Sequence, residues 1–251
     1  MIKDAIESVF SQTYKNIEYI IIDGASTDGT VEIIQSYGKR IHTFISEKDN
    51  GLYDAMNKGM KLATGEVIGI LNSDDYFANV NVISSIVNTF KIHNVDSCHG
   101  DELVINKENK ILRDCTSLDD TINLFKKGRH PHHGTFFVKN SIYKKYGYFD
   151  ISFKIAADYD LMLRFLIKNK ISTYYIKEVL VIMRAGGESQ KSIGNILRAN
   201  YECYLAWRKY GLRQNILFIA KKPLSKLHEI KSQNIKIKHN IYIKENKVIC
   251  K

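Results

Sequence analysis

The sequence predicts an α/β fold with a mostly parallel central sheet and helices on both of its faces. Three observations lead to this prediction. Short apolar segments alternate with helical stripes over the first 95 residues. These apolar segments are nearly continuous rather than alternating, as in strands that are covered on both sides. Acidic residues follow the segments, at the end of a parallel strand where ligands bind.

The elements of the first part follow from this periodicity. Ile2, Ala5, Ile6 and Val9 recur at helical spacing, so the chain opens on a helix. The hydrophobic fraction of 44% over 251 residues is sufficient for a packed core. We expect helices at 2–10, 31–37, 52–63 and 83–90, and strands at 17–22, 41–46 and 67–71.

After about residue 95 the pattern changes to shorter and more varied elements. The polar residues 107–110 indicate a hairpin loop. We expect strands at 95–100, 103–106, 111–112, 134–139 and 179–183, and helices at 118–126, 141–146, 158–169 and 193–205. The chain is thereby divided into a domain at 1–207, with halves 1–95 and 96–207, and an extension at 208–251.

The net charge of +10 lies in the extension, which holds 12 of the 37 Lys and Arg but two of the 27 Asp and Glu. The domain is therefore neutral and lacks the basic face of a nucleic-acid-binding protein. The extension suits an anionic membrane surface, or is simply solvated. The four cysteines form no CxxC pair and have neither zinc nor disulfide spacing. We expect a reducing, cytoplasmic setting, with peripheral contact at the inner face of the plasma membrane.

The stretch Asn72-Ser73-Asp74-Asp75 ends the most apolar expected strand. Two adjacent carboxylates repel each other unless a cation lies beside them. Asp74 and Asp75 therefore suit a Mn²⁺ or Mg²⁺ ion that also carries substrate phosphates. Taken alone, the stretch is explained equally well by Asp74 capping the next helix while Asp75 faces water.

Acidic side chains also follow other expected elements. Asp23 ends the strand 17–22, and the small residues after it let a flat ligand approach the backbone. In the same turn, Ser26 and Asp28 are equally good helix caps. Asp158 stands between two alanines and an aromatic residue, where a desolvated carboxyl suits a general base. The alternative is that Asp158 caps its helix through Arg164.

Two further loops carry functional residue types. His130, His132 and His133 could bind metal, but no Cys or Glu stands beside them at ligand spacing. A loop that contacts substrate, or a plain surface loop, is therefore favoured over a zinc site. Arg184 follows an apolar strand and precedes a Gly-rich loop, so it could close over a diphosphate, or be a solvated residue of a turn.

Five segments of this chain together resemble the family 2 glycosyltransferases of the GT-A fold. The resemblance is close to enzymes of bacterial exopolysaccharide, colanic-acid and lipopolysaccharide assembly. Each segment alone is a weak signal, whereas five of them in the family's order are highly specific. The segments are residues 8–14, 22–30, 47–59, 71–75 and 157–161.

The resemblance implies an inverting transfer of a sugar from a nucleotide-diphosphate donor, with a UDP-sugar expected, to a hydroxyl of a glycan or lipid-linked acceptor. This reaction would serve bacterial surface polysaccharide synthesis. It implies that Asp158 is the catalytic base and that Asp74 and Asp75 hold the metal. The implied donor-binding residues are Asp23, Ser26, Asp28, Asp49, Asn57, Asp74 and Arg184. The implied acceptor-binding residues are His132, His133 and Asp160.

The chain departs from the family pattern in three places. Asn72 takes the first position of the acidic motif, and Met56 stands where many relatives carry Arg. The family's first strand has no counterpart before the helix at 2–10. Backbone groups left unpaired there cost roughly 1–3 kcal/mol each, so we expect a truncated product or lower stability and activity. The alternatives are a catalytically impaired nucleotide-sugar-binding relative and, without a Gly-rich phosphate loop to support it, a sugar nucleotidyltransferase.

Overall fold

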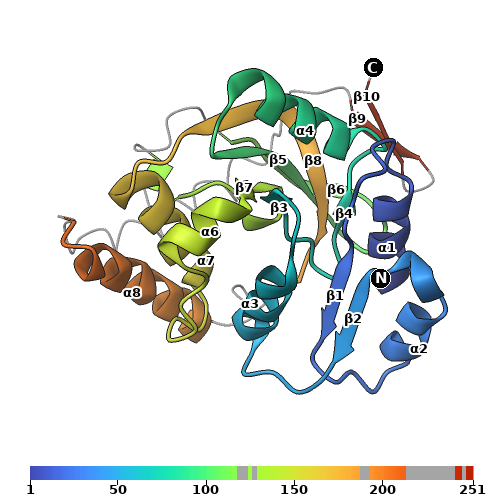
Figure 1. Cartoon of the computed structure of the whole chain (residues 1–251), viewed down its shortest axis with the longest axis horizontal. Coiled ribbons are helices and arrows are strands. Elements are labelled where there is room, and N and C mark those ends of the chain that lie inside the picture. Colours follow the sequence, from blue (N-terminus) through green and yellow to red (C-terminus); the bar gives the residue numbers. More distant parts are fainter. Residues whose placement is uncertain (118–123, 126–128, 187–192, 213–240, 245–246, 251) are drawn as a thin grey trace.

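The computed structural model describes residues 1–117, 124–125, 129–186, 193–212, 241–244 and 247–250. It confirms an α/β fold (Figure 1). The helices are α1 (Ile2–Phe10), α2 (Thr30–Gln35), α3 (Leu52–Leu62), α4 (Val82–His93), α6 (Asn140–Tyr146), α7 (Ala157–Met162) and α8 (Ile193–Lys209), with 3₁₀ turns η1 (Gly38–Arg40) and η2 (His133–Thr135) and a π-helical segment η3 (Leu163–Lys168). The strands are β1 (Ile20–Asp23), β2 (Thr43–Ser46), β3 (Val67–Ile68), β4 (Tyr76–Phe77), β5 (Ser97–Ile105), β6 (Ile111–Cys115), β7 (Phe137–Lys139), β8 (Thr173–Arg184), β9 (Ile241–Lys244) and β10 (Lys247–Cys250).

The main sheet is mixed rather than mostly parallel, which corrects the expectation from sequence. It has six strands in the order β3-β7-β5-β8-β4, with β6 added beside β5. The long strands β5 and β8 run parallel, whereas the other strand pairs described in this sheet are antiparallel. Alternating helices and strands favour parallel pairing, but β6 follows β5 through a hairpin, which makes that pair antiparallel.

One continuous strand, β5, replaces the two strands expected at 95–100 and 103–106. The polar residues at its centre resemble a loop in sequence, yet all nine residues of β5 are buried. At Gly100 a Cβ atom would lie 2.6 Å from the Leu180 side chain, so glycine permits the close approach of β8. The pairing register between β5 and β8 is irregular on both sides of Asp101, and this irregularity accommodates the remaining mismatch in the alignment of the two strands.

Helices cover both faces of this sheet. On one face α4 packs on β5 and β8, around Ile86, Leu103 and Leu180. On the other face α6, α7 and α8 lie together (Figure 1), and their buried side chains form a core that includes Tyr159 and Trp207. The expected helices at 158–169 and 193–205 are therefore confirmed, and the helix at 118–126 lies mostly outside the described residues.

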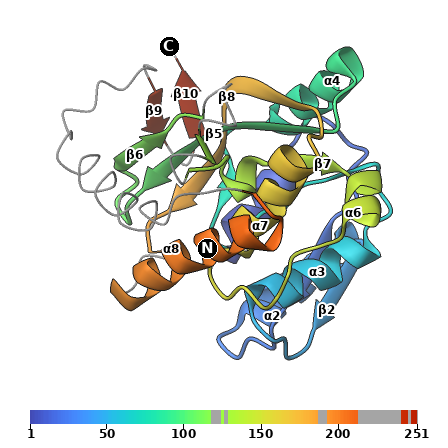
Figure 2. The same ribbon diagram turned by 90° about the vertical axis from the view of Figure 1, so that its left-hand side faces the viewer.

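A second, smaller sheet is formed by β1 and β2, which pair in parallel. Ile6, Ile21, Ile34 and Ile41 form its core with α1 and α2. Figure 2 shows β2 with α2 and α3 on the opposite side of the molecule from β6. The expected strand at 67–71 is shorter than predicted, because only Val67 and Ile68 pair with a neighbour, β7.

The extension expected at 208–251 begins within a helix, because α8 extends to Lys209.

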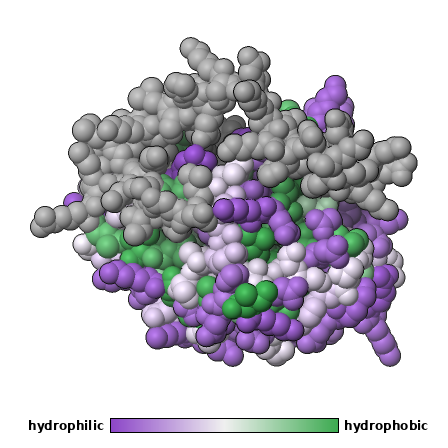
Figure 3. Space-filling model, turned by 90° about the horizontal axis from the view of Figure 1, so that it is seen from above, coloured by the Kyte–Doolittle hydropathy of each residue, from purple (hydrophilic) through white to green (hydrophobic). Residues whose placement is uncertain are grey.

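Seen from the side of α4, the coloured part of the surface mixes hydrophilic residues with smaller hydrophobic patches (Figure 3). Within the described ranges, no helix combines the length and the apolar character needed to cross a bilayer.

Candidate active site

A cavity of about 2290 Å³ separates β1 and α3 from the six-stranded sheet. It brings together residues from the ends of β3 and β8, from the loop before η2 and from the start of α7. The residues expected to bind ligands that line it are Asp74, Asp75, His132, His133, Asp158 and Arg184. Arg113 and Arg129 also line it, and a cavity with converging carboxylates, imidazoles and guanidinium groups is the natural place for a polar substrate.

The acidic motif forms a turn at the bottom of this cavity. Asn72 Nδ2 donates to Asp75 Oδ2 at 2.8 Å, and the Asp75 backbone N–H donates to the Asn72 carbonyl. Asp75 is 2% exposed, and burial, helped by the neighbouring Asp74, raises the pKa of its carboxyl to about 7. Asn72 Oδ1 and Asp75 Oδ1 are buried acceptors without a hydrogen-bond partner among the described residues. Hard oxygen atoms of this kind suit a Mn²⁺ or Mg²⁺ ion, so the residues present fit the expected metal.

Arg184 stands beside this motif at the end of β8. Its Nη1 donates to the Asp74 carbonyl oxygen at 2.9 Å, and its Nη2 pairs with Asp4 Oδ2 at 2.8 Å. The guanidinium carbon lies 5.1 Å from the centre of the Tyr76 ring. The sequence reasoning missed Asp4, which lies in the first turn of α1 outside the apolar stripe of that helix. These contacts hold the Arg184 guanidinium beside the acidic motif.

Asp158 faces the same cavity from the first turn of α7. Its Oδ1 accepts the N–H of Tyr159 at 2.7 Å and lies 3.4 Å from the Tyr53 hydroxyl. Its Oδ2 lies 3.9 Å from both His130 Nε2 and His133 Nδ1. The Arg164 side chain instead donates to the carbonyls of residues 147 and 148, so Asp158 is not the cap of a helix through Arg164.

His133 connects the two acidic groups. Its Nε2 accepts from Asn72 Nδ2 at 3.2 Å, and its Nδ1 faces Asp158 Oδ2. Since Asn72 also holds Asp75, a row of polar side chains leads from the acidic motif to Asp158, its last step being the 3.9 Å separation between His133 and Asp158. Asn72 and His133, which meet in this row, are 61 positions apart in sequence.

A separate corner of the site lies at the carboxyl ends of β1 and β2. Asp23 accepts hydrogen bonds from Ser26 N and Oγ and from Ser46 Oγ. Burial on its own would raise the pKa of Asp23, but these hydroxyl groups hold it below its usual value. Asp49 packs against Gly24 and accepts from the N–H of Gly51, which lines the cavity. Ile22 and Gly51 beside this corner line the cavity, whereas Asp23, Ser26 and Asp49 themselves do not. Asp28 is exposed and accepts from Thr30 N at the start of α2.

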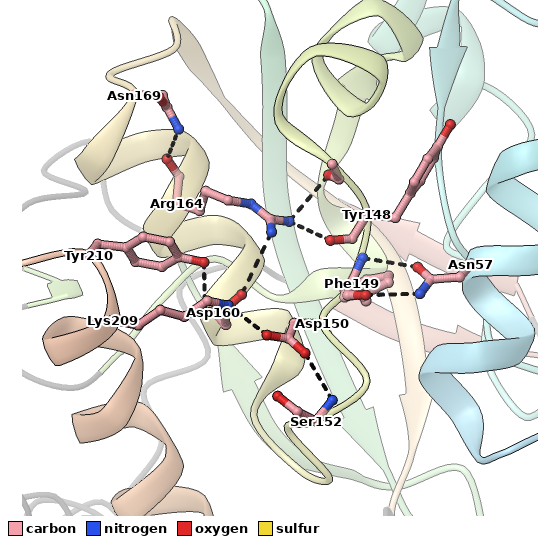
Figure 4. Close-up of polar contacts among 11 residues, drawn as sticks. Asn57, Tyr148, Phe149, Asp150, Ser152, Asp160, Arg164, Asn169, Lys209 and Tyr210 are labelled. Carbon is pink, nitrogen blue, oxygen red and sulfur yellow. Dashed lines mark hydrogen bonds and ion pairs between the residues drawn. The ribbon is translucent and has the colours of Figure 1, made fainter.

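Two further residues expected in the site also lie outside the cavity lining and have structural contacts (Figure 4). Asn57 joins α3 to the following domain half, because its side chain bonds both the N–H and the carbonyl of Phe149 at 2.9 Å. Asp160 is fully buried and accepts from Lys209 and from the Tyr210 hydroxyl. The structure brings neither residue to the lining of the cavity.

His132 and Glu102 form a further pair in the cavity wall. His132 Nδ1 lies 3.3 Å from Glu102 Oε1, and Glu102 is 3% exposed. Burial, with Asp75 nearby, raises the pKa of Glu102 to about 8, and burial, with His130 nearby, lowers the pKa of His132 to about 3. The sequence reasoning missed Glu102, because it lies in the middle of a buried strand and no local signal marks it.

Comparisons with known proteins agree with this geometry. The sequence model of the Glycosyl transferase family 2 matches residues 1–151. An uncharacterized glycosyltransferase of Rickettsia typhi is 35% identical over 192 residues, which are 72% of this chain and 59% of that protein. This chain thus spans about three fifths of that relative's length.

Solved structures of low sequence identity share the fold. TarS 1–349 of S. aureus in complex with UDP has a TM-score of 0.63 at 14% identity, covering 94% of this chain and 72% of that one. The mannosyltransferase PcManGT of Pyrobaculum calidifontis, in complex with GDP-Man and Mn²⁺, has a TM-score of 0.60 at 15% identity, covering 93% and 66%. The expected GT-A fold is therefore confirmed.

Proposed function

The chain belongs to glycosyltransferase family 2, and we propose that it transfers a sugar, with inversion, from a nucleotide-diphosphate donor to a hydroxyl group of a glycan or lipid-linked acceptor. The observation that carries this proposal is the path Asp75–Asn72–His133–Asp158. It places a cation-binding motif and a candidate base in one cavity, as an inverting displacement requires. The product would enter bacterial surface polysaccharide, as the motif resemblance implies.

The donor end of the site is assigned to residues 1–95. Asp23, with Ser26 and Asp49 beside it, binds the nucleoside at the ends of β1 and β2, and Asp28 lies at the outer edge of this corner. A UDP-sugar is the proposed donor, supported by the fold shared with TarS, whose solved complex holds UDP. We no longer assign donor contact to Asn57, because both polar atoms of its side chain bond Phe149.

The diphosphate lies between the acidic motif and Arg184. Asp74 and Asp75, with the side-chain Oδ1 of Asn72, would hold a Mn²⁺ or Mg²⁺ ion, which supplies positive charge to the departing diphosphate when bound. Arg184, already fixed by the Asp74 carbonyl and by Asp4, adds a second positive charge there. PcManGT, whose complex contains Mn²⁺, shares the fold and thus supports a divalent ion.

The acceptor end is assigned to residues 96–207, on the loop that carries His132 and His133. Asp158 Oδ2 takes the proton of the attacking hydroxyl, because its other oxygen is held by the N–H of Tyr159. His133 Nε2 lies 3.2 Å from Asn72 Nδ2, and its Nδ1 lies 3.9 Å from Asp158 Oδ2, beyond hydrogen-bond distance. His133 thus stands between the acidic motif and the proposed base. Asp160 takes no part, since it is buried in an ion-paired cluster.

A donor panel tests the proposal. Release of nucleoside diphosphate from UDP-sugars is measured with and without Mn²⁺, using the full chain and a mixed glycan acceptor pool. We expect Mn²⁺-dependent UDP release from at least one donor, and loss of that release in Asp158→Asn. Nucleotide-sugar binding without turnover of any donor would refute the proposed transfer and support the impaired-relative alternative.

The basic extension is proposed to bind an anionic membrane surface, where lipid-linked acceptors lie. It carries 12 Lys and Arg against two acids. The chain is expected to co-sediment with vesicles containing phosphatidylglycerol and to remain in solution with phosphatidylcholine vesicles alone. Equal co-sedimentation with both vesicle types would contradict this part of the proposal.

A further inference from the structure

A cluster of three side chains beside the catalytic cavity has the chemistry of a soft-metal site. Glu102 on β5, Cys115 on β6 and His132 on the loop before η2 each offer one ligand atom, and these atoms lie within 4.8 Å of one another. We propose that Glu102, Cys115 and His132 bind one Zn²⁺ ion. This site is distinct from the proposed Mn²⁺ or Mg²⁺ site at Asp74 and Asp75, and it does not depend on the proposed function.

The fold brings these residues together from distant parts of the sequence. Glu102 and Cys115 face each other as a cross-strand pair of the β5–β6 hairpin. His132 comes from a loop that the chain reaches later, and its Nδ1 already lies 3.3 Å from Glu102 Oε1. The sequence showed no zinc spacing, because the cysteine and the glutamate are not near the histidines along the chain.

The surroundings of the Glu102 carboxylate indicate a bound cation. Glu102 is 3% exposed, yet its Oε1 has no hydrogen-bond partner among the described residues. A buried carboxylate oxygen without a partner costs free energy that a bound cation would offset. Because Oε1 is the atom that faces His132, the unpartnered atom is directed at the proposed ion.

The ligand types select the metal. A Cys sulfur favours zinc over magnesium or manganese, and His, Cys and Glu are all common zinc ligands. Three protein ligands leave one tetrahedral position for water or a fourth group. Two charged residues stand beside the cluster. Arg113 hydrogen-bonds the Cys115 thiol, and Asp75 acts electrostatically on Glu102. The positive charge of Arg113 and the negative charge of Asp75 therefore offset each other.

The ion would fix a loop that matters for the reaction. His132 stands between His130 and His133, which both face Asp158 Oδ2 at 3.9 Å. Coordination of His132 would join this loop to the rigid β5–β6 hairpin. The imidazole rings of His130 and His133, which face Asp158, would then be held in place through the metal-bound His132.

Cobalt substitution of the demetallated full chain tests the proposal. Co²⁺ is expected to bind at one site that shows thiolate-to-cobalt charge-transfer absorption, and Zn²⁺ should displace it and raise the melting temperature. Cys115→Ser should lose this absorption and Glu102→Gln should weaken Zn²⁺ binding by at least about tenfold. The matched control is Cys98→Ser, a buried cysteine on the same strand as Glu102 that lies in the core on the α4 side.

Two results would overturn the assignment. One is the same charge-transfer absorption in folded Cys115→Ser. The other is a zinc X-ray absorption spectrum of the wild-type chain that shows nitrogen and oxygen ligands without sulfur, a measurement that stands even if a variant fails to fold. Mn²⁺ at the acidic motif does not interfere, because the absorption reports the sulfur ligand.

Discussion

Arg184 Nη1 donates a hydrogen bond to the backbone carbonyl of Asp74 at 2.9 Å, across a sequence separation of 110 residues. The contact joins the end of the long strand β8 to the acidic turn that follows β3. The contact holds the Arg184 guanidinium next to the carboxylates of Asp74 and Asp75 without pairing it with either one, because its Nη2 is bound to Asp4. The cation is thus fixed in position beside the acidic motif, where the proposed function places the diphosphate.

Arg184→Ala should lower kcat/KM by about 100-fold, the size expected when one donor to developing negative charge is lost. Arg184→Lys should recover little of this loss, because a single ammonium group cannot reach both Asp74 and Asp4. Steady-state kinetics with the active donor check both variants. Arg208→Ala, on the exposed end of α8, is the matched control and should keep wild-type kinetics. A Lys variant as active as the wild type would show that the fork geometry is not needed.

Asp158→Asn should reduce kcat by a factor of about 10² to 10⁴, the range for loss of a general base, while donor affinity stays the same. The melting temperature should change little, because an asparagine oxygen can still accept the N–H of Tyr159. Turnover and nucleotide binding by calorimetry give the two readouts. Near-normal turnover in this variant would remove Asp158 from the mechanism.

The difference between Asp158 and Asp160 shows what sequence can and cannot predict. Both lie in one motif, and the motif correctly placed Asp158 at the cavity because it is read from local neighbours. Residues two positions apart on a helix point to different sides, so Asp160 faces α8 instead. Its partners Lys209 and Tyr210 lie almost 50 positions later, and no local pattern pairs them with it.

The sheet shows the same limit on a larger scale. Helical stripes and apolar runs placed most elements, because these depend on periodicity within one segment. The order and direction of strands depend on partners far along the chain, and the predicted mostly parallel sheet was wrong. The polar centre of β5 resembled a loop for a similar reason, since Asp101 is satisfied by Ser117 and Tyr175 from other segments.

Asp160→Ala should destabilise the fold by about 3 kcal/mol, because it leaves Arg164 without its carboxylate partner and removes one of the two carboxylates that pair with Lys209, the other being Asp150. Urea unfolding followed by circular dichroism measures the change. Residual native protein should keep wild-type KM for the donor, because Asp160 is outside the cavity lining. A variant of normal stability with impaired acceptor use would restore Asp160 to the site.

Asp75→Asn should abolish the rise in melting temperature that Mn²⁺ and UDP together give the wild type. Without metal, the variant should be at least as stable as the wild type, because an amide replaces a buried carboxylate whose Oδ1 has no partner. Thermal melts with and without Mn²⁺ and UDP check both statements. Unchanged Mn²⁺ stabilisation in the variant would assign the ion to Asp74 or to another group.

The pair of Asp150 and Lys209 should make stability depend on pH in the acidic range. Burial alone would raise the pKa of Asp150, but the hydrogen bond from Lys209 at 2.7 Å, with a smaller one from Ser152, lowers it to about 2. The folded-state pKa lies below the ordinary value of 3.8, so the contribution is fully present above about pH 4. It is lost as the pH falls from about 4 to about 2.

Asp150→Asn should therefore destabilise the protein at pH 7 by about 1 kcal/mol, a value reduced for solvent screening because the side chain is 31% exposed. The difference from wild type should shrink as the pH falls through this window, since the wild-type carboxyl becomes protonated. Unfolding free energies at pH 7, 5 and 3 measure it. Glu32→Gln, an exposed carboxylate on α2, is the control and should show no such pH-dependent difference. A constant difference at all three pH values would mean that Asp150 acts through packing rather than charge.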